Sequence, residues 1–188
     1  MTTNNREEVT QEQLDQLVED ASYLQDEAEA LKYVIDEVPY TEAPPEGRSI
    51  AELLLLIDHA QLSYYRPVME EALNNPRPTH LKDFEHFSDT FELDEEKAEN
   101  IQKVLNKIVK HRAGLVNLIN RTPLIDWETQ VHDRDREYSL FEFASQMIRF
   151  ERNRLKDIAD LVMVFNQEKQ TRREIKKRTG NPEQATDN

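Results

Sequence analysis

Four polar residues interrupt the apolar rows of the expected helices, and their types could support chemistry. They are Gln61, Arg112, Glu151 and Arg154. Buried without partners, such groups would strongly destabilise the fold, so they must pair, reach water or line a cavity. Glu151 placed between Arg112 and Arg154 would meet this demand, since Glu151 and Arg154 are helix neighbours three positions apart.

Two interpretations of these residues stay open, provided that the inward faces are assigned correctly. One is a buried ion pair that fixes the register of the helices. The other is a small pocket that binds an anionic or polar ligand through the two guanidinium groups. The Tyr65 side chain would also line such a pocket, where its hydroxyl group could form hydrogen bonds. The candidates for lining such a pocket are Gln61, Tyr64, Arg112, Glu151 and Arg154.

Metal chemistry has weaker support in the sequence. The five histidines are His59, His80, His86, His111 and His132, and no two are three or four residues apart, the spacing of paired helical ligands. A site of His59, His111 and Glu151 is the alternative that would bind a divalent metal such as nickel or zinc. Motifs for serine nucleophiles and phosphate-binding loops are absent. We therefore expect no cofactor and assign no catalytic residue.

Composition restricts the partners and the compartment. The 188 residues include 38 Asp or Glu against 24 Lys or Arg, a net charge of -14, which repels nucleic acids and anionic membrane surfaces. The longest apolar run, Leu53 to Ile57, is far shorter than a membrane span, and the polar start MTTNNREEV is no signal peptide. Cysteine is absent, which fits a reducing compartment. We expect a cytoplasmic protein without nucleic-acid or membrane partners.

The elements that must position these residues are four amphipathic helices, so the fold class is all-α. Hydrophobic residues make up 37% and glycines number three, which favours long helices over a turn-rich β fold. Capping pairs at Thr10 and Gln13, Ser49 and Glu52, and Ser139 and Glu142 predict three helix starts, and Asp94 precedes the remaining helix. Pro67 should bend the end of the second helix, near residue 74.

Long connections separate the second helix from the third and the third from the fourth. Residues 74–93 and 124–138 lack a sustained helical pattern, and the former could span about 65 Å when extended. A parallel crossover is therefore possible, and an up-down-down-up bundle is favoured. We predict a disordered N-terminus at residues 1–9, a bundle domain at 10–168, and a basic, disordered tail at 169–188.

Three segments resemble the DinB/YfiT-like superfamily of four-helix bundles. The first is Ser49 to Gln61, the second runs from Trp127 through His132 to Ser139 and Leu140, and the third is Ser139 to Ile158. The resemblance implies the up-down-down-up fold, a tendency to form homodimers and a cavity at the family's metal site. Members of that family use three histidines, often with nickel or zinc. Here those positions hold Leu56, Phe150 and Arg154, which are not ligands for such metals.

Three hypotheses follow. The first is a DinB-like protein with a degenerate metal site that binds a small polar or anionic ligand in the bundle core, or whose core is filled. The second is a metal-dependent hydrolase or thiol-dependent transferase that uses displaced ligands such as His59, His111, Glu151 or His132. The third is an interaction protein whose acidic first helix and basic residues 168–188 bind partner proteins.

Overall fold

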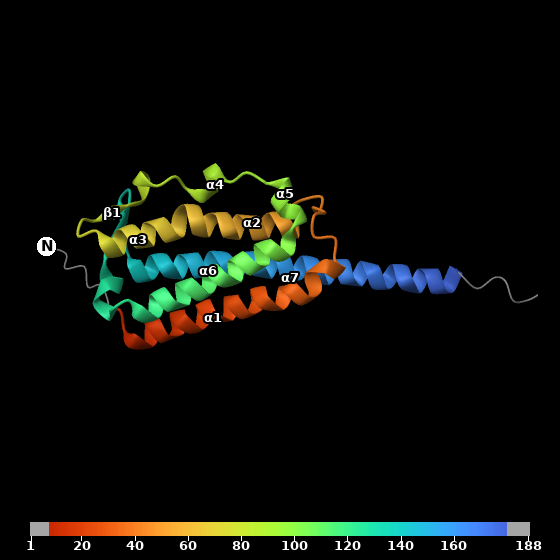
Figure 1. Cartoon of the computed structure of the whole chain (residues 1–188), viewed down its shortest axis with the longest axis horizontal. Helices are drawn as coiled ribbons and strands as arrows, with labels where there is room; N and C mark the ends of the chain where they lie inside the picture. Colours follow the sequence, from red (N-terminus) through yellow and green to blue (C-terminus); the bar gives the residue numbers. More distant parts are fainter. Residues whose placement is uncertain (1–7, 180–188) are drawn as a thin grey trace, which may run out of the picture.

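The computed structural model describes residues 8–179 and shows four rods packed lengthwise (Figure 1). The first rod is α1 (Gln11–Val34), followed by the 3-10 turn η1 (Ile35–Glu37). The second is continuous and comprises α2 (Ile50–Ala60), η2 (Gln61–Tyr65) and α3 (Arg66–Asn74). The third and fourth are α6 (Ile101–Arg121) and α7 (Leu140–Thr179). The predicted all-α four-helix bundle is confirmed.

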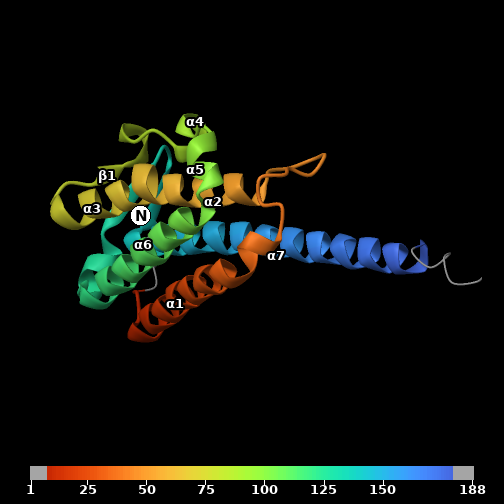
Figure 2. The same cartoon turned by 45° about the vertical axis from the view of Figure 1, so that its right-hand side comes forward.

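The direction of the rods confirms the up-down-down-up topology. α1 and α7 run one way, whereas α2 and α6 run the other way (Figures 1 and 2). α1 packs against α6 and α7, and α2 packs against the same two helices. The connection from α3 to α6 crosses the length of the bundle through β1 (Thr79–His80), η3 (Leu81–Asp83), α4 (Phe87–Thr90) and α5 (Glu95–Glu99).

The predicted capping residues begin three of the rods. The Thr10 hydroxyl accepts from the Gln13 backbone N–H, and the Gln13 side chain accepts from the Thr10 N–H in return. Ser49 caps α2, and Ser139 with Glu142 forms the reciprocal pair before α7. These side chains satisfy backbone donors that a helix start otherwise leaves unpaired. Asp94 caps only the short α5, because the chain leaves the helical conformation at Asn100 before α6 begins.

A π-helical turn, η2, lies just before Pro67, where the sequence predicted a bend, and ends at Tyr65. Here the backbone N–H of Arg66 donates to the carbonyl of Gln61, five residues earlier. Proline lacks the N–H that would continue the regular ladder, and such wide turns are frequent at functional sites. Gln61, Tyr64 and Tyr65 in this turn are all buried.

The connection at 124–138 is ordered, which the sequence did not predict. The 3-10 segment η4 (Leu124–Glu128) buries Trp127 completely. It leads into β2 (Gln130–Asp133) and β3 (Arg136–Ser139), which pair antiparallel, while β1 pairs parallel with β2. Strands of two to four residues are too short to show a reliable period in the sequence.

At both ends of the bundle, the structure orders residues for which the sequence predicted disorder. α7 continues to Thr179 and projects beyond the bundle, so residues 169–179 are helical rather than a disordered tail (Figure 1). Their Lys, Arg, Glu and Gln side chains are good helix formers, and an existing helix extends at little cost. At the other end, Val9 is buried and its backbone N–H donates to the Glu128 carboxylate. Residues 1–7 and 180–188 lie outside the described part. Across residues 8–179, no helix is long and apolar enough to cross a membrane.

The capping pair of α1 gives a first prediction. Thr10→Ala should lower the free energy of unfolding by about 1 kcal/mol, because the Gln13 backbone N–H loses the hydroxyl that accepts its hydrogen bond. Urea unfolding checks the value. The matched control is Thr171→Ala on the exposed end of α7, where the hydroxyl bonds only a carbonyl of its own helix; it should not destabilise. Equal effects of the two substitutions would contradict the role of the cap.

Candidate functional site

Three of the expected polar residues meet in the bundle core. Glu151 of α7 forms an ion pair with Arg112 of α6 and accepts a hydrogen bond from the Gln61 side-chain amide of η2. Arg112 and Glu151 are only 3% and 2% exposed. We call Gln61, Arg112 and Glu151 the polar triad. The polar triad joins three of the four rods. Burying its groups away from water costs free energy, and their contacts with one another offset that cost.

The space beside the polar triad is small. A cavity of about 10 Å³ lies next to Arg112, lined also by Asp58, His111 and Gln61. That volume holds about one water molecule. One terminal nitrogen of Arg112 lies buried at this layer without a hydrogen-bond partner among the described residues. The expected ligand pocket inside the core is therefore not formed, because the charged side chains occupy the space themselves.

Arg112 stays positively charged at neutral pH. Burial lowers the pKa of Arg112 to about 9, which still leaves the guanidinium positively charged at pH 7. Beside it, the imidazole Nδ1 of His111 lies 3.2 Å from the Asp58 carboxylate. This second contact ties α6 to α2 one layer out from the ion pair.

Arg154 does not join the triad, contrary to expectation. Its side chain is 34% exposed and forms an ion pair with Asp157, 3.2 Å away on the same helix. Its guanidinium lies 5.9 Å from the centre of the Phe150 ring. The position is at the edge of the buried face, and a long cationic side chain there reaches toward solvent.

Aromatic side chains occupy the region of the resembled family's metal positions. Phe150 packs against Phe87 of α4 and Tyr65 of η2, with ring centres 4.8 and 6.0 Å apart. Tyr64 and Phe143 extend the same cluster. Burial raises the pKa of Tyr64 and Tyr65, so both stay neutral phenols. With Leu56 buried on α2, these positions do not fit a metal ion.

In the described chain, the three side chains of the alternative metal site, His59, His111 and Glu151, have other partners. His59 lies 2.9 Å from the Thr90 hydroxyl, His111 faces Asp58, and Glu151 is held by Arg112. His132, the other displaced candidate, lies 3.6 Å from Glu137 and stacks near His80. Within residues 8–179, no three His, Asp or Glu side chains are grouped so as to hold a metal.

A groove that the sequence did not reveal lies between η2 and α3 on one side and α6 on the other. Its volume is about 430 Å³, and we call it the α3–α6 groove. Its apolar lining is Leu62, Met69, Leu115 and Leu118, and its polar lining is Gln61, Arg66, Glu70, Lys110, His111 and Arg121. Gln61 and His111 also line the small core cavity, so the groove adjoins the polar triad.

The charge of this groove is opposite to that of the whole protein. Its sole carboxylate, Glu70, is 2.6 Å from Arg66, which neutralises it. Lys110 and Arg121 form no ion pair within the described chain, and Arg121 donates only to the Asn117 carbonyl. The signal in the sequence was α6 itself, which has three Lys and two Arg but no Asp or Glu.

Gly114 opens the wall of the groove. A Cβ atom added there would meet no atom within 4 Å. Packing therefore does not require glycine, although glycine inside a helix costs up to about 1 kcal/mol relative to alanine. The residue leaves space at the groove that a side chain would otherwise fill.

Comparison with known proteins identifies the fold. No protein-family model matches the sequence, and no curated protein matches it significantly. Among solved structures, YfiT from Bacillus subtilis, described as a probable metal-dependent hydrolase with an unusual four-helix bundle topology, superimposes with a TM-score of 0.69. The identity is 12%, over 87% of this chain and 93% of YfiT. This protein therefore has the YfiT-like four-helix bundle fold.

Proposed function

We propose that this protein binds a small anionic molecule with an apolar body in the α3–α6 groove. The observation that carries the proposal is the combination of apolar walls, two cations without carboxylate partners and an open glycine position. Ligand sites are concave and mostly apolar, with a few polar groups that fix orientation. An anionic head would contact Lys110 and Arg121, and an apolar body would lie along Leu115 and Leu118.

This proposal moves the expected ligand from the core to the groove beside it. The polar triad is internally paired, so its role is to hold α6 and α7 in register and to fix Gln61 at the groove wall. The metal-dependent hydrolysis ascribed to YfiT is not carried over. Leucine, phenylalanine and a half-exposed arginine stand where the resembled family places its histidines.

Ligand charge gives the first test of the groove. Decanoate should bind at least tenfold more tightly than decyltrimethylammonium, which has an alkyl chain one carbon longer and a cationic head, in isothermal titration below micelle concentrations. The net charge of -14 alone would favour the cation, so this preference would report the local field of the groove. Equal affinities, or tighter binding of the cation, would contradict the proposal.

Charge reversal localises the effect. Lys110→Glu combined with Arg121→Glu should weaken decanoate about tenfold, because two surface attractions of up to about 1 kcal/mol become repulsions. Lys103→Glu is the matched control on the same helix, outside the groove. It should leave decanoate affinity within about twofold.

Filling the groove gives an independent prediction. Gly114→Leu should reduce decanoate affinity at least tenfold without lowering the free energy of unfolding, since the added side chain enters open space. Gly114→Ala should keep binding and raise the free energy of unfolding by about 0.5–1 kcal/mol. Titration and urea unfolding give the two readouts. A Gly114→Leu protein that binds like the unaltered chain would place the ligand elsewhere.

A further inference from the structure

The two cations of the α3–α6 groove that have no carboxylate partner lie far apart on one wall. Lys110 and Arg121 are eleven residues apart on α6, which corresponds to about three helical turns and about 16 Å along the helix axis. Because three turns return a helix to the same side, both side chains start from the face of α6 that lines the groove. The groove therefore has a separate cation for each of two anionic groups.

The wall between these two cations is apolar and open. Gly114, Leu115 and Leu118 of α6 line the groove between them, and Leu62 and Met69 line it from the other side. A Cβ atom added at Gly114 would meet no atom within 4 Å, so the middle of the groove has free space. A charged group placed there would lose water without gaining a partner, whereas an alkyl chain would gain apolar contact.

The opposite wall does not neutralise either cation. Glu70 is the one carboxylate among the described residues that line the groove, and its oxygen lies 2.6 Å from Arg66 Nε. Arg121 donates from Nε to the Asn117 carbonyl, a neutral partner. Both Lys110 and Arg121 thus keep their charge available to a ligand, within the described part of the chain.

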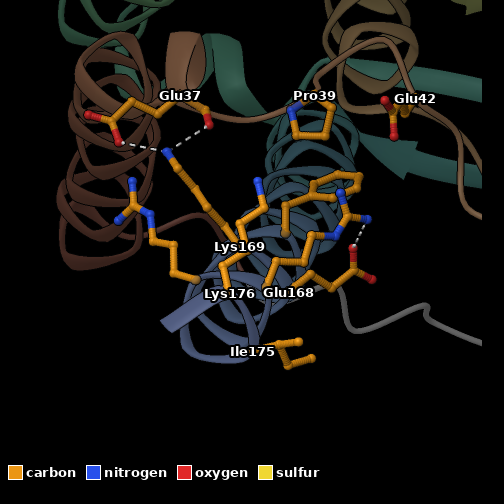
Figure 3. A pocket seen from close by; sticks show the side chains of 10 residues that line it. Glu37, Pro39, Glu42, Glu168, Lys169, Ile175 and Lys176 are labelled. Carbon is orange, nitrogen blue, oxygen red and sulfur yellow. Dashed lines mark hydrogen bonds and ion pairs between the residues drawn. The ribbon is translucent and has the colours of Figure 1, made fainter. Parts of the chain in front are cut away.

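The crevice where α7 leaves the bundle has a different distribution of charge (Figure 3). Its volume is about 550 Å³, and Glu37, Glu42 and Glu168 line it together with its cations. Lys169 lies 3.4 Å from the Glu37 carboxylate, and Arg172 lies 3.9 Å from that of Glu168. Carboxylates of the protein already occupy the positions that an anionic ligand would need, so this crevice lacks the charge pattern of the α3–α6 groove.

We propose that the ligand of the α3–α6 groove is a dianion whose two anionic groups lie at opposite ends of an extended apolar chain. The inference rests on the proposed function and specifies its ligand class. An extended chain of single bonds advances about 1.2 Å per bond, so the carboxyl carbons of decanedioate lie about 11 Å apart. A contact of about 3 Å at each end extends this reach to about 17 Å, which matches the separation of Lys110 and Arg121 along α6.

The first test compares decanedioate with its monomethyl ester by isothermal titration of the full chain. The two molecules have the same chain, but the ester has one anionic end instead of two. Decanedioate should bind about three- to fivefold more tightly, the gain that one further exposed ion pair gives. The net charge of -14 would by itself disfavour the second carboxylate, so this preference would report the second cation of the groove.

The second test reverses one cation at a time. Lys110→Glu and Arg121→Glu should each weaken decanedioate about tenfold, because one end then meets a carboxylate. Each should weaken decanoate only about twofold, because its single head can still contact the remaining cation. Continued binding of decanoate also shows that the variant is folded. Lys103→Glu, outside the groove, is the matched control and should leave both affinities unchanged.

Two results would overturn this inference and leave the proposed function intact. One is an ester that binds as tightly as decanedioate, and the other is a single charge reversal that weakens decanedioate and decanoate by the same factor. In both cases decanoate would still bind more tightly than decyltrimethylammonium. Failure of decanoate and decanedioate alike to bind would instead contradict both proposals.

Discussion

The ion pair between Arg112 and Glu151 is the constraint on which the rest of this structure depends. Two charges that are almost fully buried strongly destabilise a fold unless they are paired. Pairing requires α6 and α7 to meet at one register, and the Gln61 amide brings η2 to the same point. A sliding of either helix by one turn would leave a buried charge uncompensated, so the pair selects one alignment of three rods.

The same pair limits the open space in the centre of the bundle. Arg112 and Glu151 pair with each other and leave room beside them for about one water molecule, so the space next to the pair does not hold a larger molecule. Phe150 and its aromatic neighbours fill the adjacent region. The α3–α6 groove begins instead at the outer side of Gln61 and His111. One of its walls is α6, a helix without Asp or Glu. Charge is therefore segregated, with acidic α1 and basic α6 packed against each other.

The sequence was sufficient to predict the helices, their caps, the topology and the meeting of Gln61, Arg112 and Glu151, because apolar spacing and the cost of buried charge are local and strong signals. It was insufficient for Arg154, whose position at the edge of the buried face leaves its side chain 34% exposed. The α3–α6 groove depends on the distance between η2 and α6. The spacing of residues along a single helix does not determine that distance. The helical conformation of residues 169–179 could not be predicted, because polar composition alone does not distinguish a solvated helix from a flexible tail.

The most direct test is a double-mutant cycle on the free energy of unfolding, with Arg112→Met, Glu151→Leu and the two combined. If the pair closes the core as described, each single substitution costs about 3–5 kcal/mol, because it strands a buried charge. The double variant should then be at least about 2 kcal/mol more stable than the sum of the single effects predicts. Single effects that add to within about 0.5 kcal/mol would show that the two side chains do not interact, and would contradict the account.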